Sequence, residues 1–282
     1  MVLESVLNPF TAAKRPWELL IAGIIYGTAA LFLSIWIFEE YASLVMVFLA
    51  VLASLPLFYK TMKAEEAKDL IINSESKLLK EHGKAIMLLV LLFLGLTIAF
   101  SFWYTVLPAE TSNSVFKIQT QTIASLNQQV TGSIAKFNLL NRIFLNNIKV
   151  LIFCILFSFI YGSGAVFILT WNASVIGAAA GNFIRTHLAQ YAGAVGFAKI
   201  SGYFYASSLS LLRYSLHGIP EILAYFVAGL AGGILSVAII KKDFGTKRFE
   251  RILLDSSDLI LIAVFILFVA ALIEVFITPI FF

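Results

Sequence analysis

The chain has 282 residues, of which 60% are hydrophobic and 13% are charged, and its formal net charge is +4. Soluble domains carry about 25% charged residues, so the composition excludes an ordinary soluble domain. The basic residues stand in loops beside apolar runs, where they set membrane topology, so the net charge does not indicate nucleic-acid binding. Several runs exceed the roughly 18 to 20 apolar residues that cross a bilayer. We therefore predict an all-α polytopic membrane protein with about seven crossings.

The N-terminal region, residues 1–107, is predicted to contain three membrane spans. They lie at residues 19–38, 41–59 and 85–107. Residues 60–84 between the last two spans alternate lysines with acidic residues, a pattern typical of a solvated helical extension. We expect this connector to be cytoplasmic, because cytoplasmic loops carry the excess of lysine and arginine.

Residues 108–142 form a second region that is rich in Ser, Thr, Asn and Gln. Apolar residues recur in it at steps of three to five, which predicts an amphipathic helix or a pair of helices. Its polarity excludes a spanning role. We expect it to lie on the extracytoplasmic surface or to cap the bundle.

Residues 143–282 form the third region, the membrane core. We predict a fourth span at 143–170, a broken segment at 171–216 that contains a short helix at 172–184, a helix from His217 to about Ile240, and a last span at 259–277. Glycines and polar residues interrupt the broken segment. Such backbone survives at membrane depth only when it is buried in protein or lines a cavity.

The basic residues predict the topology. Lys14, the connector 60–84 and the basic loop 241–251 all fall on the cytoplasmic side if the broken segment crosses the membrane once. This gives seven crossings in the cell membrane, with the N-terminus cytoplasmic and the C-terminus extracytoplasmic. If the broken segment dips and returns instead, the last basic loop lies outside.

The stretch from His217 to Glu221 is predicted to open a helix. Pro220 suits a first helical position because proline has no N–H to lose there, and Glu221 would then lie at the positive end of the helix dipole. Small residues in and before this helix should let other helices approach closely. They are Gly177, Gly181, Ala224, Ala228, Gly229, Gly232 and Gly233. These seams also suggest a homodimer, unless all of them are used within one chain.

Five polar residues from three segments are predicted to share the outer layer of the membrane, namely Asn146, Asn147, His217, Glu221 and Glu274. Together with Asn172 they form the candidate site. Glu221 would be the carboxylate for a proton or cation, with His217 as its partner and the asparagines as neutral ligands. Alternatively, these residues lock the bundle, and Asn172 caps the short helix.

The same residues and the rest of the chain bear on two further kinds of chemistry, metal binding and catalysis. His217 and Glu221 stand four positions apart and could meet a metal ion, but no second close histidine follows, so a metal site stays an open question. No motif of a nucleophile or a phosphate-binding loop is present. We expect a protein that is not an enzyme, with no catalytic residue and no cofactor.

The order of several short motifs resembles the stage II sporulation protein M family of integral membrane proteins. The resembling residues are Asn146-Asn147, Gly162, Gly164, Asn172, Gly177, His217-Gly218, Glu221, the glycines 229, 232 and 233, and residues 271–274 before Pro279. They lie mainly in residues 140–282. The bacterial sporulation member helps to hold peptidoglycan-cutting proteins at a septum, so the resemblance implies a scaffold with membrane or envelope protein partners.

Two functions therefore remain open at this point. The buried polar set favours a protein of the lipid bilayer that binds or translocates an ion, a proton or a small solute. The resemblance favours a non-catalytic membrane scaffold.

Overall fold

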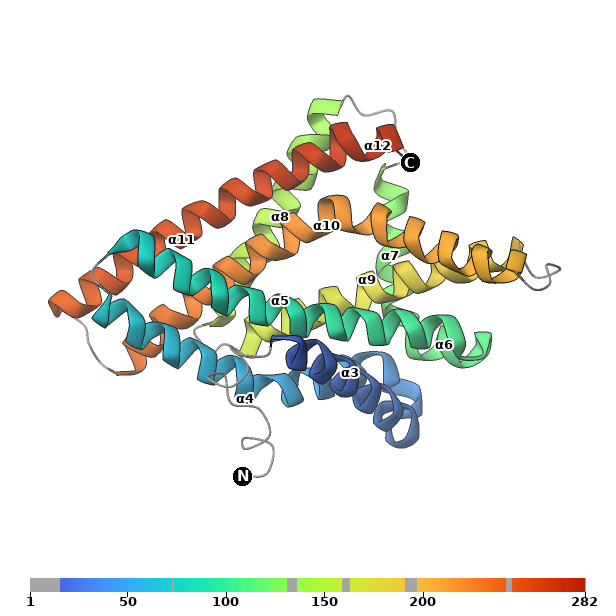
Figure 1. The fold of residues 1–282 in the computed structure, drawn as a ribbon, viewed down its shortest axis with the longest axis horizontal. Helices are drawn as coiled ribbons and strands as arrows, with labels where there is room; N and C mark the ends of the chain where they lie inside the picture. The colour runs from blue at the N-terminus through green and yellow to red at the C-terminus, as the bar shows by residue number, and fades with distance from the viewer. Residues whose placement is uncertain are drawn as a thin grey trace.

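The structure is a computed structural model, and it describes residues 16–72, 74–130, 136–158, 163–190, 197–241 and 245–281. Within these ranges every secondary-structure element is a helix, which confirms the predicted all-α fold. Seven of the described helices are long and apolar enough to cross a membrane. Most of them run along the longest axis of the molecule (Figure 1).

The three predicted N-terminal spans correspond to the first three long helices. These are α3 (Trp17–Ile37), α4 (Ala42–Ile71) and α5 (Glu75–Val106), with a 3-10 turn η1 (Glu39–Tyr41) between α3 and α4. The connector 60–84 is helical almost throughout, as predicted, because α4 and α5 extend into it from both sides. It is not solvated throughout, since Glu65, Glu66 and His82 are buried.

The polar stretch after α5 folds into a pair of helices, α6 (Ala109–Val115) and α7 (Lys117–Val130). Phe116 joins them and is fully buried. Its ring centroid lies 6.4 Å from that of Phe100 and 5.2 Å from that of Tyr104, both on α5. The pair therefore packs onto one end of the bundle, where α7 crosses the lengthwise helices steeply (Figure 1).

The C-terminal half differs from its predicted organisation. Its elements are α8 (Lys136–Ser158), α9 (Ser163–Gln190), α10 (Phe197–Ile240), α11 (Lys247–Leu272), a π-helical turn η2 (Ile273–Ile277) and α12 (Thr278–Phe281). The predicted fourth span at 143–170 is wrong, because α8 ends at Ser158 and α9 begins at Ser163. Apolar residues follow each other on both sides of this boundary, so hydropathy alone merged two helices into one.

The predicted break after residue 184 is also wrong, because α9 continues to Gln190. Arg185 donates hydrogen bonds to the carbonyl oxygens of Thr105, at 3.2 Å, and Leu107 at the end of α5. Its guanidinium also lies 5.4 Å from the ring centroid of Tyr104. A cation is favourable at the negative end of a helix dipole, so Arg185 finds partners without interrupting its own helix.

The helix predicted to open at His217 is the second half of the longer helix α10. Pro220 lies inside α10 rather than in its first turn. Glu221 is therefore far from a helix N-terminus, and its predicted stabilisation by the dipole is wrong. A proline inside a helix removes one backbone hydrogen bond and bends the axis. Figure 1 shows α10 bent about midway along its length.

Small residues set the closest contacts between the long helices. A Cβ atom on Gly95 of α5 would lie 2.9 Å from Cα of Gly23 on α3. On the other side of α5, Cβ atoms on Gly177 and Gly181 of α9 would lie 2.7 Å from the Cβ atoms of Phe100 and Tyr104. Helix α5 is thus held between α3 and α9 at nearly backbone contact.

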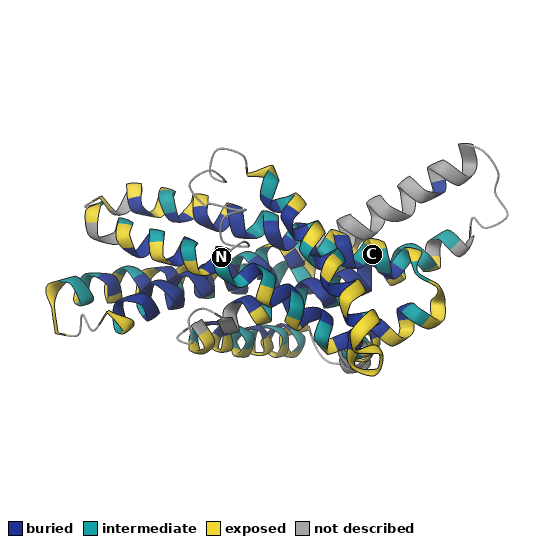
Figure 2. Ribbon diagram, turned by 90° about the horizontal axis from the view of Figure 1, so that it is seen from below, coloured by how far each residue is buried: buried dark blue, intermediate teal, exposed yellow. Residues whose placement is uncertain are grey.

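The small residues of α10 are used in the same way. A Cβ on Gly233 would lie 2.5 Å from Sδ of Met62 on α4. The remaining small residues of the predicted seam are buried, namely Ala224, Ala228, Gly229 and Gly232. Since the contacts resolved for these seams lie within one chain, they give no reason to expect a homodimer. Buried residues concentrate where the helices cross, and exposed residues follow the outer helices (Figure 2).

The two basic connectors lie at the same end of the molecule. The chain passes from α4 to α5 and from α10 to α11 at the left end in Figure 1. This agrees with the prediction that both connectors face the same side of the membrane. Two ion pairs, described below, join the connectors directly.

Candidate functional site

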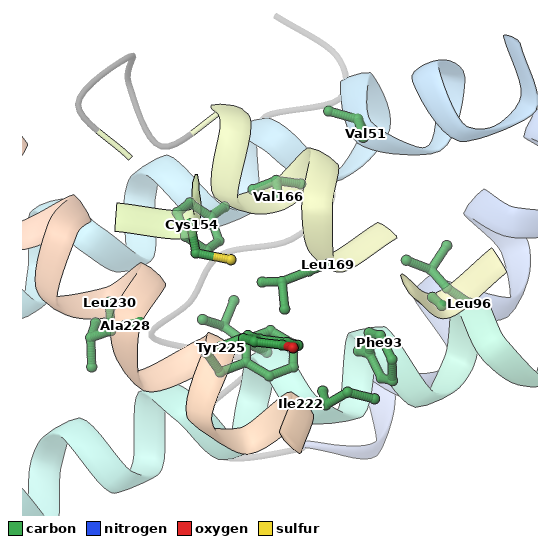
Figure 3. Packing of buried hydrophobic residues seen from close by; sticks show 14 of the residues in the cluster. Val51, Phe93, Leu96, Cys154, Val166, Leu169, Ile222, Tyr225, Ala228 and Leu230 are labelled. Carbon is green, nitrogen blue, oxygen red and sulfur yellow. The ribbon is translucent and has the colours of Figure 1, made fainter. Parts of the chain in front are cut away.

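Glu221 and Tyr225 form the centre of the candidate site on α10. The hydroxyl of Tyr225 donates a hydrogen bond of 2.7 Å to Oε1 of Glu221, one helical turn away. Tyr225 is 1% exposed and belongs to the main buried cluster (Figure 3). Glu221 itself is partly exposed. The carboxylate therefore lies at the edge of the core with its hydrogen-bond donor inside.

Glu274 is predicted to approach this pair from the other end of the chain. It lies in the π-helical turn η2, which packs against α10. Cys154 of α8 and Tyr225 belong to the same buried cluster (Figure 3). Single π turns inside α-helices occur frequently at functional sites. The structure therefore places the two elements that carry Glu221 and Glu274 in contact, and the approach of the two side chains stays a prediction.

The paired asparagines of α8 do not both face this site. Asn147 is buried on the side of α8 that also carries Leu151 and Cys154, whereas Asn146 is exposed. Neighbouring residues of a helix point about 100° apart, so only one of the two can face the core. The prediction that Asn146 is a ligand in a buried site is therefore wrong. Both residues also lie in the middle of α8 rather than in its first turn.

Asn172 lies inside α9 and does not cap a helix. Its side-chain Nδ2 donates a 2.9 Å hydrogen bond to the carbonyl oxygen of Ile168, one turn earlier. The predicted capping role is wrong because α9 starts at Ser163, well before this residue. The side chain of His217 lies outside the described part of the structure, so its predicted pairing with Glu221 stays a prediction.

A second polar cluster, at the end of the molecule where the two basic connectors lie, was not predicted. Glu66 of α4 is fully buried. Its two oxygens lie 2.6 Å from Nζ of Lys241 and 2.9 Å from Nη2 of Arg248, at the end of α10 and the start of α11. The preceding residue, Glu65, pairs instead with α5. We call Glu66, Lys241 and Arg248 the Glu66 cluster.

Glu65 is nearly as buried as Glu66 and makes two contacts. Its Oε2 lies 3.0 Å from Nδ1 of His82, and its Oε1 accepts a hydrogen bond of 2.7 Å from Lys68. Adjacent glutamates on α4 thus join it to α5 on one side and to the α10–α11 hairpin on the other. Buried charges are stable only when they are paired in this way.

A signal for this cluster exists in the sequence. Phe58, Met62 and Glu66 follow each other at steps of four, and all three are buried. The buried face of α4 therefore continues from its apolar part into the charged connector. Extending the four-residue spacing of Phe58 and Met62 into the connector would have identified Glu66 as inward-facing.

A third buried polar cluster fixes α7 to the bundle. The side chain of Gln119 is fully buried. Its Oε1 accepts a hydrogen bond of 2.6 Å from Ser43 of α4, and its Nε2 donates at 3.2 Å to Oγ of Ser174 of α9. Three separate segments of the chain therefore meet at one side-chain amide.

Replacing Gln119 with leucine should lower the free energy of unfolding by about 1 to 3 kcal/mol, because buried polar partners lose their hydrogen bonds. Limited proteolysis within α6 and α7 should become faster for the same reason. The matched control is Gln121→Leu on the exposed side of the same helix, which should change neither quantity. Equal behaviour of the two variants would contradict the role of Gln119.

The described residues form a small cavity and no cluster of metal ligands. They contain no group of three His, Cys, Asp or Glu residues that could hold a metal ion. The side chain of His217 lies outside the described part of the structure, so a metal site at this residue stays an open question. A cavity of about 20 Å³ lies between α4, α5, α9 and α10, with Ser54 and Thr170 as the polar residues of its lining. It has room for roughly one water molecule.

These features define the class of protein. It is a multi-pass helical membrane protein with buried ionisable residues, Glu65, Glu66 and His82, in the connector 60–84. Residues 88–279 match the family described as stage II sporulation protein M, and the chain belongs to this family. The match begins inside α5, earlier than the predicted start near residue 140, and so includes α6 and α7. No curated protein and no solved structure matches the chain.

Proposed function

We propose that this membrane protein binds and translocates a proton or a small cation at Glu221 and Glu274. The observation that carries the proposal is the contact of α10 with η2, the elements that carry these two carboxylates, inside candidate membrane spans. Two acidic side chains at such a position repel each other unless a proton or a cation is shared between them. Ionisable groups within membrane spans are rare and are usually part of ion or proton pathways.

The surroundings of Glu221 support this proposal. Tyr225 donates a hydrogen bond to Oε1 of the carboxylate, and the residue is partly exposed. In this proposal the second oxygen takes up the ligand. Pro220 has no N–H to donate to the carbonyl oxygen of Leu216, one turn earlier. A carbonyl without its helical partner is a suitable cation ligand in broken or bent membrane helices.

The two carboxylates also lie at the two irregular points of their helices. Glu221 directly follows the bend at Pro220, and Glu274 lies within the π turn. Bends and π turns are places where a helix can change direction at low cost. Binding at this position could therefore couple to movement of the outer half of α10 against α11.

Transport assays in liposomes test the proposal. A membrane potential should drive proton or cation entry into liposomes that contain the wild type. Glu221→Gln and Glu274→Gln should each lower the rate of entry at least about tenfold, because each removes a group that takes up the ion. The matched control is Glu250→Gln at the exposed start of α11, which should keep the wild-type rate. All variants should first show unchanged helicity and elution volume.

Two results would contradict the proposal. One is flux that is the same in the Glu221→Gln variant and in the wild type. The other is the absence of flux above protein-free liposomes together with an infrared carboxyl band that does not change in Glu221→Gln.

For the orientation we propose that both basic connectors are cytoplasmic. The support is their position at one end of the molecule together with the positive-inside rule. The site at Glu221 then lies in the outer half of the cell membrane, with the N-terminus inside and the C-terminus outside. Accessibility of single cysteines introduced at positions 80 and 121 to a membrane-impermeant reagent would test this orientation.

A scaffold for membrane or envelope proteins is the second candidate, and the fixed position of α7 favours it. Gln119 anchors α7 rigidly, while Lys117, Thr120 and Gln121 are exposed on it. A rigid polar surface next to the bundle suits the docking of a partner. Substitutions of these exposed residues that abolish a partner contact and leave ion flux intact would favour this candidate.

A further inference from the structure

The helix α8 carries a row of polar side chains on its exposed face. After Lys136 in the first turn, the exposed polar residues are Asn138, Asn141, Arg142, Asn146 and Lys149. Asn138, Arg142, Asn146 and Lys149 recur at steps of four, four and three, and Asn141 lies beside Arg142, so they form one stripe along the helix. The opposite face is buried against the bundle through residues such as Leu140 and Cys154. The stripe is unusual because α8 is a candidate membrane span.

Contacts with the last helices fix the level of this stripe. The Phe144 ring centroid lies 5.7 Å from that of Phe268, and Leu140 packs in one buried cluster with Val275. The ammonium group of Lys136 lies 5.9 Å from the ring centroid of Phe276. The two segments therefore run antiparallel, with residues 136–144 of α8 level with residues 268–276.

At this level the last helices present only apolar side chains among their strongly exposed residues. Phe268 and Phe276 are each 42% exposed, and Ile280, nearer the C-terminus, is 76% exposed. Side chains of this kind face acyl chains in a membrane protein. The polar stripe thus begins at a level where its neighbours contact hydrocarbon. Asn146 and Lys149 lie deeper still along α8.

The chemistry of the stripe selects what can cover it. Its side chains offer N–H donors, and two of them, Arg142 and Lys149, carry positive charges. A second copy related by a twofold axis would bring the same cations together at the same depth, which is repulsive. A phosphate group accepts several hydrogen bonds and carries the opposite charge.

We propose that this face of α8 binds the phosphate group of anionic lipids and draws it below the level of the surrounding bilayer surface. Lipids adapt to polar residues at this depth by local thinning, so that headgroups reach the side chains. Further along the same face the exposed residues are apolar, including Ile152, Phe153 and Leu156. They provide a surface for the acyl chains of the same lipid.

Native mass spectrometry of the full chain tests this inference. The protein is extracted from vesicles that contain equal amounts of phosphatidylglycerol and phosphatidylcholine. The wild type should retain phosphatidylglycerol in preference, and R142Q/K149Q should retain several-fold less of it with unchanged phosphatidylcholine. The matched control is K77Q/K80Q, which removes two exposed cations at the start of α5 and should behave as the wild type.

Three results would overturn the inference. The first is wild-type retention of phosphatidylglycerol by R142Q/K149Q, and the second is an equal loss in K77Q/K80Q. The third is efficient disulfide formation between two copies through N146C in native membranes, because a second copy would then cover the stripe. None of these readouts depends on ion flux, so they are independent of the proposed function.

Discussion

Replacing both Lys241 and Arg248 with methionine should lower the free energy of unfolding by about 3 to 5 kcal/mol. Glu66 is fully buried, and these two cations are the partners of its two oxygens. Without them a carboxylate would remain in the interior with no opposite charge. The loss can be measured by unfolding the protein in mixed micelles and following its helicity.

Two further variants distinguish the effect of an unpaired buried charge on stability from the effect of removing surface charges. Adding Glu66→Leu to the double variant should restore most of the stability, because the uncompensated carboxylate is then gone. Lys77→Met with Lys80→Met, two exposed residues of α5, should change stability by less than about 1 kcal/mol. A double variant at 241 and 248 that is as stable as this control would show that Glu66 is hydrated.

Gly95→Ala should destabilise the protein by about 3 kcal/mol, at the upper end of the range for overpacked cores. The added Cβ would lie 2.1 Å from the carbonyl oxygen of Leu20 and 2.9 Å from Cα of Gly23. Both are backbone atoms of α3, so no side chain can rotate away and the helices must separate. The same unfolding assay measures the effect.

The control for this experiment is Gly83→Ala in the same helix. A Cβ at Gly83 would meet no atom within 4 Å. Alanine is favoured over glycine inside a helix, so this variant should be more stable than the wild type by up to about 1 kcal/mol. If Gly95→Ala lowers the stability and Gly83→Ala raises it, contact with α3 rather than helix propensity decides the role of Gly95. A change of stability in the same direction for both variants would contradict this role.

Sequence reasoning predicted the number of spans better than their limits. Hydropathy identified the N-terminal helices because charged or proline-containing turns separate them. It failed at the boundary between Ser158 and Ser163, where both flanking helices are apolar. Pro220 led to the opposite error, a predicted helix start at a place where α10 continues, because a proline suits a helix start and a bend inside a helix equally well. Only packing around α10 distinguishes these two uses.

The candidate site was predictable in part for a related reason. Topology alone placed Glu221 and Glu274 at one depth, and the structure brings the helix α10 and the turn η2 that carry them into contact. To predict which way a side chain faces, its position within a helix of known limits is needed, and the predicted limits of α8 were wrong. Asn146 therefore counted as buried although it is exposed. Glu66 was missed because a charged connector was interpreted as solvated, although the buried face of α4 continues through it.

The position of Glu66 also constrains how the polypeptide is made. Its partners stand 175 and 182 positions later in the chain, near the last helical hairpin. During synthesis, α4 therefore enters the membrane long before Lys241 and Arg248, the cations that pair with Glu66, leave the ribosome. Until then the carboxylate must stay in contact with water. The end of α4 can settle into its final place only when biosynthesis is almost complete.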